Sequence, residues 1–335
     1  MKKNTLGLLM LLAVIGCLGI WLSYRWAFPP FTPSALPEPN GYDDLLTAAE
    51  MLAPRTGFYD EMDEEELAAV VAHNEPALQL ARKALAKECM VPLDWSAGAT
   101  WVDQDYLDKC SEMRSVARAF AAETRQASML GDSDTAIRCG IDNFRLGCVT
   151  ANGGLNVDWL VGQAIGSIGR RILREQIEQC SEAQCQQIME AVEKQEPYLE
   201  SPSQVLQRER AYYRHTIGLM GAYTQLLMHR QLEQALELLN NAEQLYGIMR
   251  DLLRVHVAIR QFELAEERLP ENLSDLVPQY LSRVPIDPYA KSELTYRLKN
   301  DSYLLYSFGP NQIDDGGVES TGGKNGDLLL RTSGS

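Results

Sequence analysis

The side chains that most often carry catalysis are scattered along this chain of 335 residues. The histidines have no partner at the H-x-x-x-H or similar spacing that zinc sites use: His73, His215, His229 and His256. The densest polar cluster lies in a helical pattern, where such residues more often form a solvated face than an acid–base site: Glu209, Arg210, Tyr213 and His215. No serine or cysteine stands in a nucleophile-elbow motif. We therefore expect a protein that is not an enzyme.

Cysteine chemistry is left open by the sequence. Six cysteines follow the apolar N-terminal segment: Cys89, Cys110, Cys139, Cys148, Cys180 and Cys185. None has the C-x-x-C spacing of redox and zinc motifs. An even number in an exported region permits disulfides, and buried free thiols are the alternative. The spacing predicts no particular pairing.

The most regular motifs lie near the C-terminus. Apolar residues spaced for one face of a short helix come first, with Asn272 or Ser274 as a cap: Leu269, Leu273, Leu276, Val277 and Leu281. Pro285 and Pro288 then exclude helix and favour turns. The alternation of Leu294, Tyr296 and Leu298, followed by the run from 303 to 308, predicts an antiparallel hairpin.

Four motifs follow one another in this region: L-V-P-Q-Y-L at 276–281, P-I-D-P-Y at 285–289, Y-L-L-Y-S-F-G at 303–309 and D-D-G-G at 314–317. In this order they resemble the C-terminal half of the major pseudopilin of type II secretion systems. The resemblance covers residues 260–327 and implies a long helix followed by a small α+β module with antiparallel strands.

The resemblance also implies a cofactor, because the acidic loop of that family binds calcium. Calcium takes oxygen ligands from carboxylates, amides and backbone carbonyls. The matching positions here are Asp314, Asp315 and Asp327 for carboxylates, with Asn311 or Asn325 for an amide oxygen. The alternative is that Asn, Asp and Gly serve only as turn formers in a solvated loop.

The N-terminus differs from that family. Pseudopilins carry a glycine cleavage site with a glutamate five residues later, and their first helix leads directly into the globular part. Here Gly7 is followed by an apolar run without glutamate, and the similar segment begins only near residue 260. Processing as a pilin and assembly into a filament are therefore not expected.

The residues 1–27 read as a signal anchor. The run from Leu6 to Leu22 has no charge, follows two lysines and is followed by aromatic residues suited to an interface. The lysines predict a cytoplasmic N-terminus and an extracytoplasmic body, as in a single-pass protein of the bacterial inner membrane. A lipoprotein anchored at Cys17, within V-I-G-C, and a cleaved signal peptide are the alternatives.

The next segments predict a stalk and a helical body. Residues 28–41 contain five prolines and read as an extended spacer. Helical patterns then cover the following ranges: 42–52, 63–73, 74–87, 103–130, 133–149, 155–178, 181–197, 203–228 and 232–267. We expect an α-helical domain of hairpins over 42–240, and a long helix with the pseudopilin-like β module over 241–335. Gly162, Gly166 and Gly169 are expected to admit a neighbouring helix rather than to bind a nucleotide.

Composition limits the function. A net charge of −15 argues against nucleic acid as a partner. The sequence therefore predicts a mostly α-helical envelope protein with a non-catalytic role in binding or assembly. The pseudopilin resemblance of the C-terminal module implies a link to secretion or pilus-like machinery. The alternative is an extracytoplasmic hydrolase whose site is assembled from distant residues.

Overall fold

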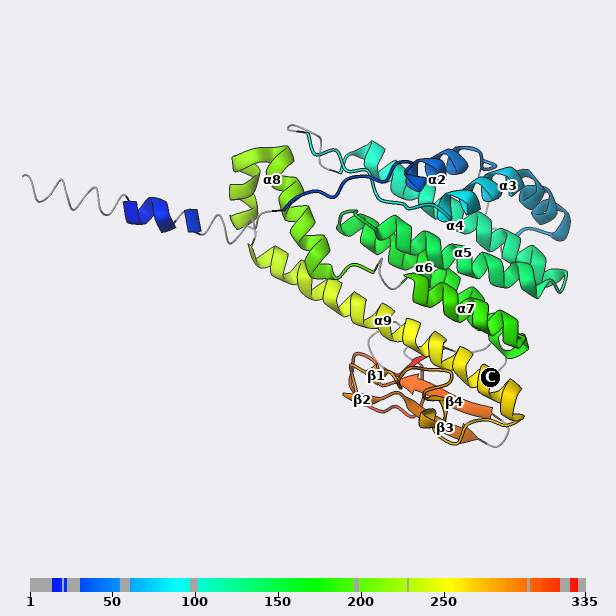
Figure 1. Cartoon of the computed structure of the whole chain (residues 1–335). Coiled ribbons are helices and arrows are strands. Elements are labelled where there is room, and N and C mark those ends of the chain that lie inside the picture. Colours follow the sequence, from blue (N-terminus) through cyan, green and yellow to red (C-terminus); the bar gives the residue numbers. More distant parts are fainter. Residues whose placement is uncertain are drawn as a thin grey trace, which may run out of the picture.

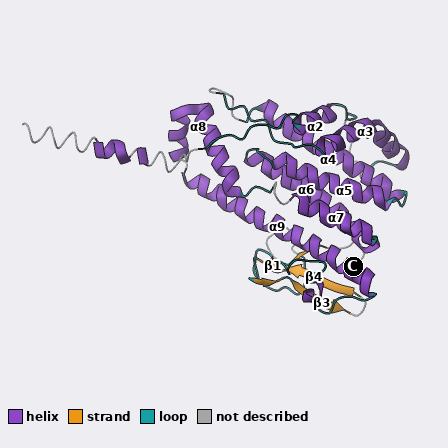
Figure 2. Ribbon diagram, in the orientation of Figure 1, coloured by secondary structure: helices purple, strands orange, loops and turns teal. Residues whose placement is uncertain are grey.

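The computed structural model describes residues 14–19, 21–22, 31–54, 61–96, 102–195, 199–227, 229–299, 302–319 and 326–330, without the side chains of 217, 219–233 and 235. Within these ranges the chain is mostly helical, and its small antiparallel sheets lie at the C-terminal end. Figure 2 shows this segregation of helix and strand. The predicted order of a helical body followed by a small α+β module is confirmed.

Apart from the division predicted within 63–87, the helices follow the predicted ranges closely: α2 (Gly41–Glu50), α3 (Glu64–Leu85), α4 (Gln104–Met129), α5 (Ser133–Ala151), α6 (Asn156–Gln176), α7 (Glu182–Gln195), α8 (Pro202–Leu227) and α9 (His229–Glu266). A short 3-10 turn, η2 (Ile177–Gln179), extends α6. Side-chain caps begin several helices, because Asn40, Asp63 and Asp103 each accept a backbone N–H of the first turn.

The prediction of two helices over 63–87 is wrong, because α3 continues through Pro76. The apolar side chains on both sides of the proline share one buried face, which includes Leu67 and Leu78. Asn74 does not cap a new helix. Its side-chain oxygen instead accepts the Ala53 N–H at 2.8 Å. This hydrogen bond connects α3 to the segment that follows α2. Burial of one continuous face outweighs the hydrogen bond that Pro76 cannot donate.

The prediction that small residues allow close helix approach is confirmed for α5 and α6. A β-carbon on Gly162 would lie 2.4 Å from the Gly147 carbonyl oxygen, and one on Gly169 would lie 2.6 Å from the Gly140 carbonyl oxygen. No side chain fits at these distances. Glycine is therefore required on both helices, whose backbones are in contact along the crossing.

The C-terminal module forms after a short 3-10 turn, η4 (Leu273–Leu276), which Asn272 precedes. The predicted hairpin is confirmed as β3 (Thr295–Lys299) and β4 (Ser302–Ser307), with β5 (Leu328–Leu329) added antiparallel to β4. A separate pair, β1 (Ile286–Asp287) and β2 (Ser292–Glu293), precedes them. The three strands β1, β2 and β5 are each two residues long, too short to leave an alternating pattern.

Asp287, in the P-I-D-P-Y motif, connects the turn at 285–289 to the end of β4. Its side chain is fully buried. It accepts hydrogen bonds from the Tyr289 N–H, the Ser307 hydroxyl and the Phe308 N–H, each at 2.9 Å. The aspartate of the P-I-D-P turn thus holds the end of β4, so this side chain has a structural role.

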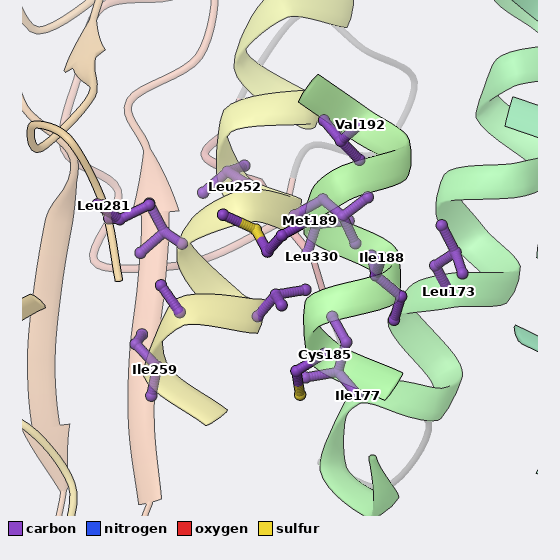
Figure 3. Close-up of a cluster of buried hydrophobic side chains, with 14 of the residues drawn as sticks. Leu173, Ile177, Cys185, Ile188, Met189, Val192, Leu252, Ile259, Leu281 and Leu330 are labelled. Carbon is purple, nitrogen blue, oxygen red and sulfur yellow. The ribbon is translucent and has the colours of Figure 1, made fainter. Parts of the chain in front are cut away.

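Helix α9 lies between the other helices and the C-terminal sheet (Figure 1). It contacts α6, α7 and α8 as well as β4, β5 and η4. One hydrophobic core contains Leu173 of α6, Ile188 of α7, Leu252 of α9 and Leu281 of the module, and Figure 3 shows these side chains gathered together. Position 240 lies inside α9, and residues of both predicted domains share this core.

The predicted anchor from Leu6 to Leu22 lies largely outside the described residues. The part that is described, 14–19 and 21–22, is helical, and the apolar side chains of Val14, Ile15, Leu18 and Leu22 are exposed. Among the described residues, no helix combines the length and apolar character needed to cross a membrane. In the predicted spacer, residues 31–40 contain neither helix nor strand, and Phe31 stacks on Trp95 with 5.5 Å between ring centroids.

Candidate functional site

A surface groove lies between α3 on one side and α4 and the start of α5 on the other. It has a volume of about 580 Å³, which is in the range of ligand and peptide sites. Six small or apolar side chains line it together with eight charged or polar side chains, which lie at its floor and rim: Ala68, Val71, Ala72, Glu75, Leu78, Gln79, Arg82, Glu123, Gln126, Ala127, Leu130, Asp132, Thr135 and Arg138. We call it the α3–α4 groove.

The floor of the α3–α4 groove is an ion network centred on Arg82. The guanidinium donates from Nε to Asp142 at 2.8 Å and from a terminal nitrogen to Glu123 at 2.6 Å. Its carbon lies 5.1 Å from the centre of the Phe120 ring. The second oxygen of Glu123 faces Arg138 at 3.4 Å. Each charge of the floor is therefore paired within the protein.

Pairing also controls protonation at this floor. Burial raises the pKa of Asp142, and the hydrogen bond from Arg82 partly offsets that effect. A carboxylate held by a guanidinium is a poor general base, because its protonation would break the ion pair with the partly buried Arg82. The floor is suited to shaping a binding surface and not to proton transfer.

The most buried polar cluster lies elsewhere, at the start of α6. Asp158 accepts the Leu155 N–H at 2.7 Å, the Cys110 thiol at 3.4 Å and the Tyr106 hydroxyl. Burial raises the pKa of Asp158, and these donors oppose the rise. A carboxylate that caps the first turn of its own helix and accepts two further side chains has a structural role as a helix cap.

Glu209 of α8 faces the same helix start and accepts the Asn156 N–H at 3.2 Å. Burial raises its pKa from 4.5 to about 7, and the nearby Asp158 adds to the rise. Neighbouring Arg208 donates from Nε to the Gly154 carbonyl at 2.7 Å and pairs with Glu200. These contacts dock α8 onto the turn between α5 and α6.

The polar cluster predicted on this helix is divided among different surroundings. Tyr213 stays beside Glu209, and burial followed by that carboxylate raises the tyrosine pKa to about 12. His215 is exposed, and its ring lies 5.6 Å from that of Trp95. The Nε of Arg210 is buried without a hydrogen bond. The four residues therefore do not converge on one point where a substrate could react.

The other histidines also lie apart. His73 is exposed on α3. His256 of α9 is buried, and its Nδ1 lies 2.7 Å from the Tyr303 hydroxyl of β4. Burial, with a contribution from Arg174, lowers the pKa of His256 to about 4. The side chain of His229 lies outside the described residues.

The six cysteines that follow the N-terminal segment are all free and buried in this structure. Of the two alternatives, disulfides or buried free thiols, the structure has the free thiols. Burial raises the pKa of Cys89, Cys110 and Cys148 to about 12 in each case. A thiol with such a pKa is a weak nucleophile near neutral pH. These side chains fill the core as small apolar groups.

The predicted calcium ligands lie close to one another in the loop after β4. Asp327 is fully buried and accepts the N–H groups of Asp315 and Gly317, at 3.3 and 2.6 Å. Asn311 donates from its amide to Asp315 at 2.8 Å. Asp314 accepts the Tyr306 hydroxyl at 2.7 Å and pairs with Arg297 at 2.8 Å. Asn325 lies outside the described residues.

The donor set fits a hard cation in part. Burial raises the pKa of Asp327, and the charges of Asp314 and Asp315 add to this rise. The backbone N–H groups that Asp327 accepts oppose it. Within the described chain no basic side chain forms an ion pair with Asp315 or Asp327, so a bound cation would relieve their repulsion. However, the described residues contain no group of three or more His, Cys, Asp or Glu side chains arranged to hold a metal. Calcium therefore stays a prediction.

The α3–α4 groove was not predicted. Its key contact joins Arg82 to Asp142, 60 positions apart in the chain, and helical periodicity gives the buried face of each helix without naming its partner. The only local signal is a charge inside an otherwise apolar stripe. Comparison with protein-family models, with curated proteins and with solved structures finds no match to this chain.

Proposed function

We propose that this chain is a non-catalytic envelope protein that binds a protein partner through the α3–α4 groove. The observation that carries the proposal is a groove of about 580 Å³ that combines three alanines, a valine and two leucines with internally paired charges at its floor. Such a surface offers shape and burial to a ligand. The described residues that line it include no histidine, serine or cysteine, and its Glu123 carboxylate is engaged by Arg82.

The walls favour a helical segment as the occupant. Ala68 and Ala72 stand one turn apart on α3 and face Ala127 of α4 across the groove. Small side chains on two walls let a third helix approach closely, as in the helix-in-groove mode of recognition. Exposed Leu130, 76% accessible at the end of α4, provides an apolar anchor at one end.

The charges of the rim favour a basic partner. Glu75 and Asp132 are exposed at the rim, whereas Arg138 is turned to Glu123. The whole chain carries a net charge of −15. The occupant that fits is therefore an amphipathic helix with a narrow apolar face and Lys or Arg along its edge.

The proposed location follows from the N-terminal sequence. Leu6–Leu22 would anchor the protein in the inner membrane with the groove on the extracytoplasmic side. The exposed apolar side chains of Val14, Ile15 and Leu18 support such an anchor. A mature mass that begins at Cys17 and includes lipid would replace the anchor with the lipoprotein alternative.

The test uses the tagged full-length protein, purified from its native membranes in mild detergent, with mass spectrometry of the proteins that accompany it. Ala72→Trp fills the groove. Ala183→Trp makes the same change at an exposed position of α7 and is the matched control. A partner that accompanies the wild type and Ala183→Trp, and is lost with Ala72→Trp, supports the proposal.

Two outcomes contradict the proposal. Equal recovery of the partner with all three proteins would place the contact elsewhere. Recovery of no partner under conditions that keep known membrane complexes intact would argue against a binding role. Recovery of secretion or pilus components by the wild type would extend the pseudopilin resemblance of residues 260–327 from sequence to function.

A further inference from the structure

A small cavity lies where α5 and α6 meet α9, far along the chain from the α3–α4 groove. Its volume is about 20 Å³, enough for a single water-sized occupant. Two arginines line it, Arg170 of α6 and Arg250 of α9, together with Cys148 of α5. The one carboxylate in its lining is Glu200.

The charge balance of this cavity is positive. Glu200 has both oxygens engaged by Arg208, at 2.6 Å each, so it is not available to Arg170 or Arg250. Arg170 is 6% exposed, and its guanidinium donates a hydrogen bond to a neutral group, the Ser167 hydroxyl, at 2.7 Å. Its other close partner is the ring of Tyr246, 5.4 Å away.

The surroundings of Arg170 leave its charge uncompensated. Burial lowers the pKa of Arg170 to about 10; Cys148 and Tyr246 oppose that fall, and the like charge of Arg250 adds to it. The groups that act on Arg170 among the described residues thus include no carboxylate. Arg250 in turn has a buried Nε without a hydrogen bond. Arg250 also acts on the carboxylate of Glu243, which is exposed at the surface. A buried cation is stable when it is paired, and Arg170 has no such counter-charge among the described residues.

We propose that this cavity binds a small inorganic anion of the size of chloride between Arg170 and Arg250. A water molecule would fit the volume but would leave the two guanidinium groups repelling each other, whereas a monoanion offsets both charges. The anion would hold α6 against α9. This site is independent of the α3–α4 groove, so either proposal can fail without the other.

The first test compares the melting temperature of the full-length protein in sodium chloride and in sodium gluconate at equal ionic strength. Gluconate is too large for the cavity. At a tenfold excess over its dissociation constant, chloride should raise the melting temperature by about 2 °C. Arg170→Met should abolish the difference. Arg171→Met, one position later on the exposed face of α6, should keep it. Equal melting of the wild type in both salts would overturn the proposal.

The second test needs no variant and decides the matter if Arg170→Met does not fold. Crystals of the wild-type protein are soaked in sodium bromide, and the anomalous difference map is calculated at the bromine edge. A peak within contact distance of both Arg170 and Arg250 is expected. A map with bromide peaks at the protein surface and none between these arginines would show that water, not an anion, fills the cavity.

Discussion

Arg208 holds Glu200 with both terminal nitrogens, at 2.6 Å to each carboxylate oxygen. The Arg208 side chain is 9% exposed and that of Glu200 is 22% exposed, so this pair is largely removed from water. It connects α8 to the segment before it, and the Nε of Arg208 reaches back to the Gly154 carbonyl. The turn between α5 and α6 thereby becomes fixed to α8.

Replacing one member of this pair should be costly. Arg208→Met leaves the Glu200 carboxylate without its partner, and we expect the free energy of unfolding to fall by about 3 kcal/mol, measured by urea denaturation. The control is Lys194→Met, because Lys194 and Glu190 are 65% and 67% exposed and 3.3 Å apart. It should cost less than about 1 kcal/mol. Equal losses for the two variants would contradict the structural role of Arg208.

The crossing of α5 and α6 gives a sharper test of packing. Gly162→Ala would place a methyl group 2.4 Å from the Gly147 carbonyl oxygen, which forces the helices apart and should cost about 3 kcal/mol. Gly247→Ala in α9 meets no atom within 4 Å. That substitution should stabilise the protein by about 0.5 to 1 kcal/mol through helix propensity alone. Thermal and urea unfolding should therefore show a lower free energy of unfolding for Gly162→Ala and a higher one for Gly247→Ala. A Gly162→Ala protein as stable as the wild type would refute the close approach.

The boundaries of the helices could be predicted because caps and periodicity are local. Asp103 and the apolar stripes defined α4 and its neighbours, and Gly162 and Gly169 pointed to a close helix contact without identifying α5 as the partner. The helix break predicted at Pro76 was wrong. A proline inside a helix normally favours a break, but α3 buries one apolar face on both sides of Pro76, and this burial outweighs the lost hydrogen bond. The groove and the arginine cavity could not be predicted. Their residues come from different helices, and periodicity carries no information on which helices meet.

Glu209 should make the protein less stable at higher pH. Its pKa is near 7 in the folded protein and 4.5 as its ordinary value. The folded state therefore holds a proton that the unfolded state has lost, and stability falls as the pH rises from 4.5 through 7. Glu209→Gln removes this titration. Relative to the wild type, the variant should gain about 2 kcal/mol between pH 5 and pH 8, whereas Glu193→Gln at an exposed position of α7 should gain nothing. Parallel pH profiles of the wild type and Glu209→Gln would exclude the buried acid.

The calcium prediction can be tested by removing the ion. If the loop after β4 binds calcium as the resemblance implies, the melting temperature of the full-length protein should be higher with calcium than with a chelator, because the ion binds only the folded loop. Asp327→Asn should remove that difference, and Asp105→Asn, at an exposed position of α4, should retain it. An identical melting temperature of the wild type in both conditions would mean that Asn311, Asp314, Asp315 and Asp327 serve as turn formers.

His256 should have the opposite pH dependence to Glu209. Burial and the nearby Arg174 lower its pKa from 6.5 to about 4, so the folded protein keeps the ring neutral while the unfolded chain takes up a proton below pH 6.5. Stability is then fully present above that pH and is lost as the pH falls toward 4. His256→Asn cannot be protonated and retains a polar group toward Tyr303. Between pH 7 and pH 4.5 it should gain about 2 kcal/mol relative to the wild type. His73→Asn, at an exposed position of α3, should show no such gain. Since α9 carries His256 between the body and the sheet, an absent pH effect would mean that this interface admits water and that the histidine is not sealed within it.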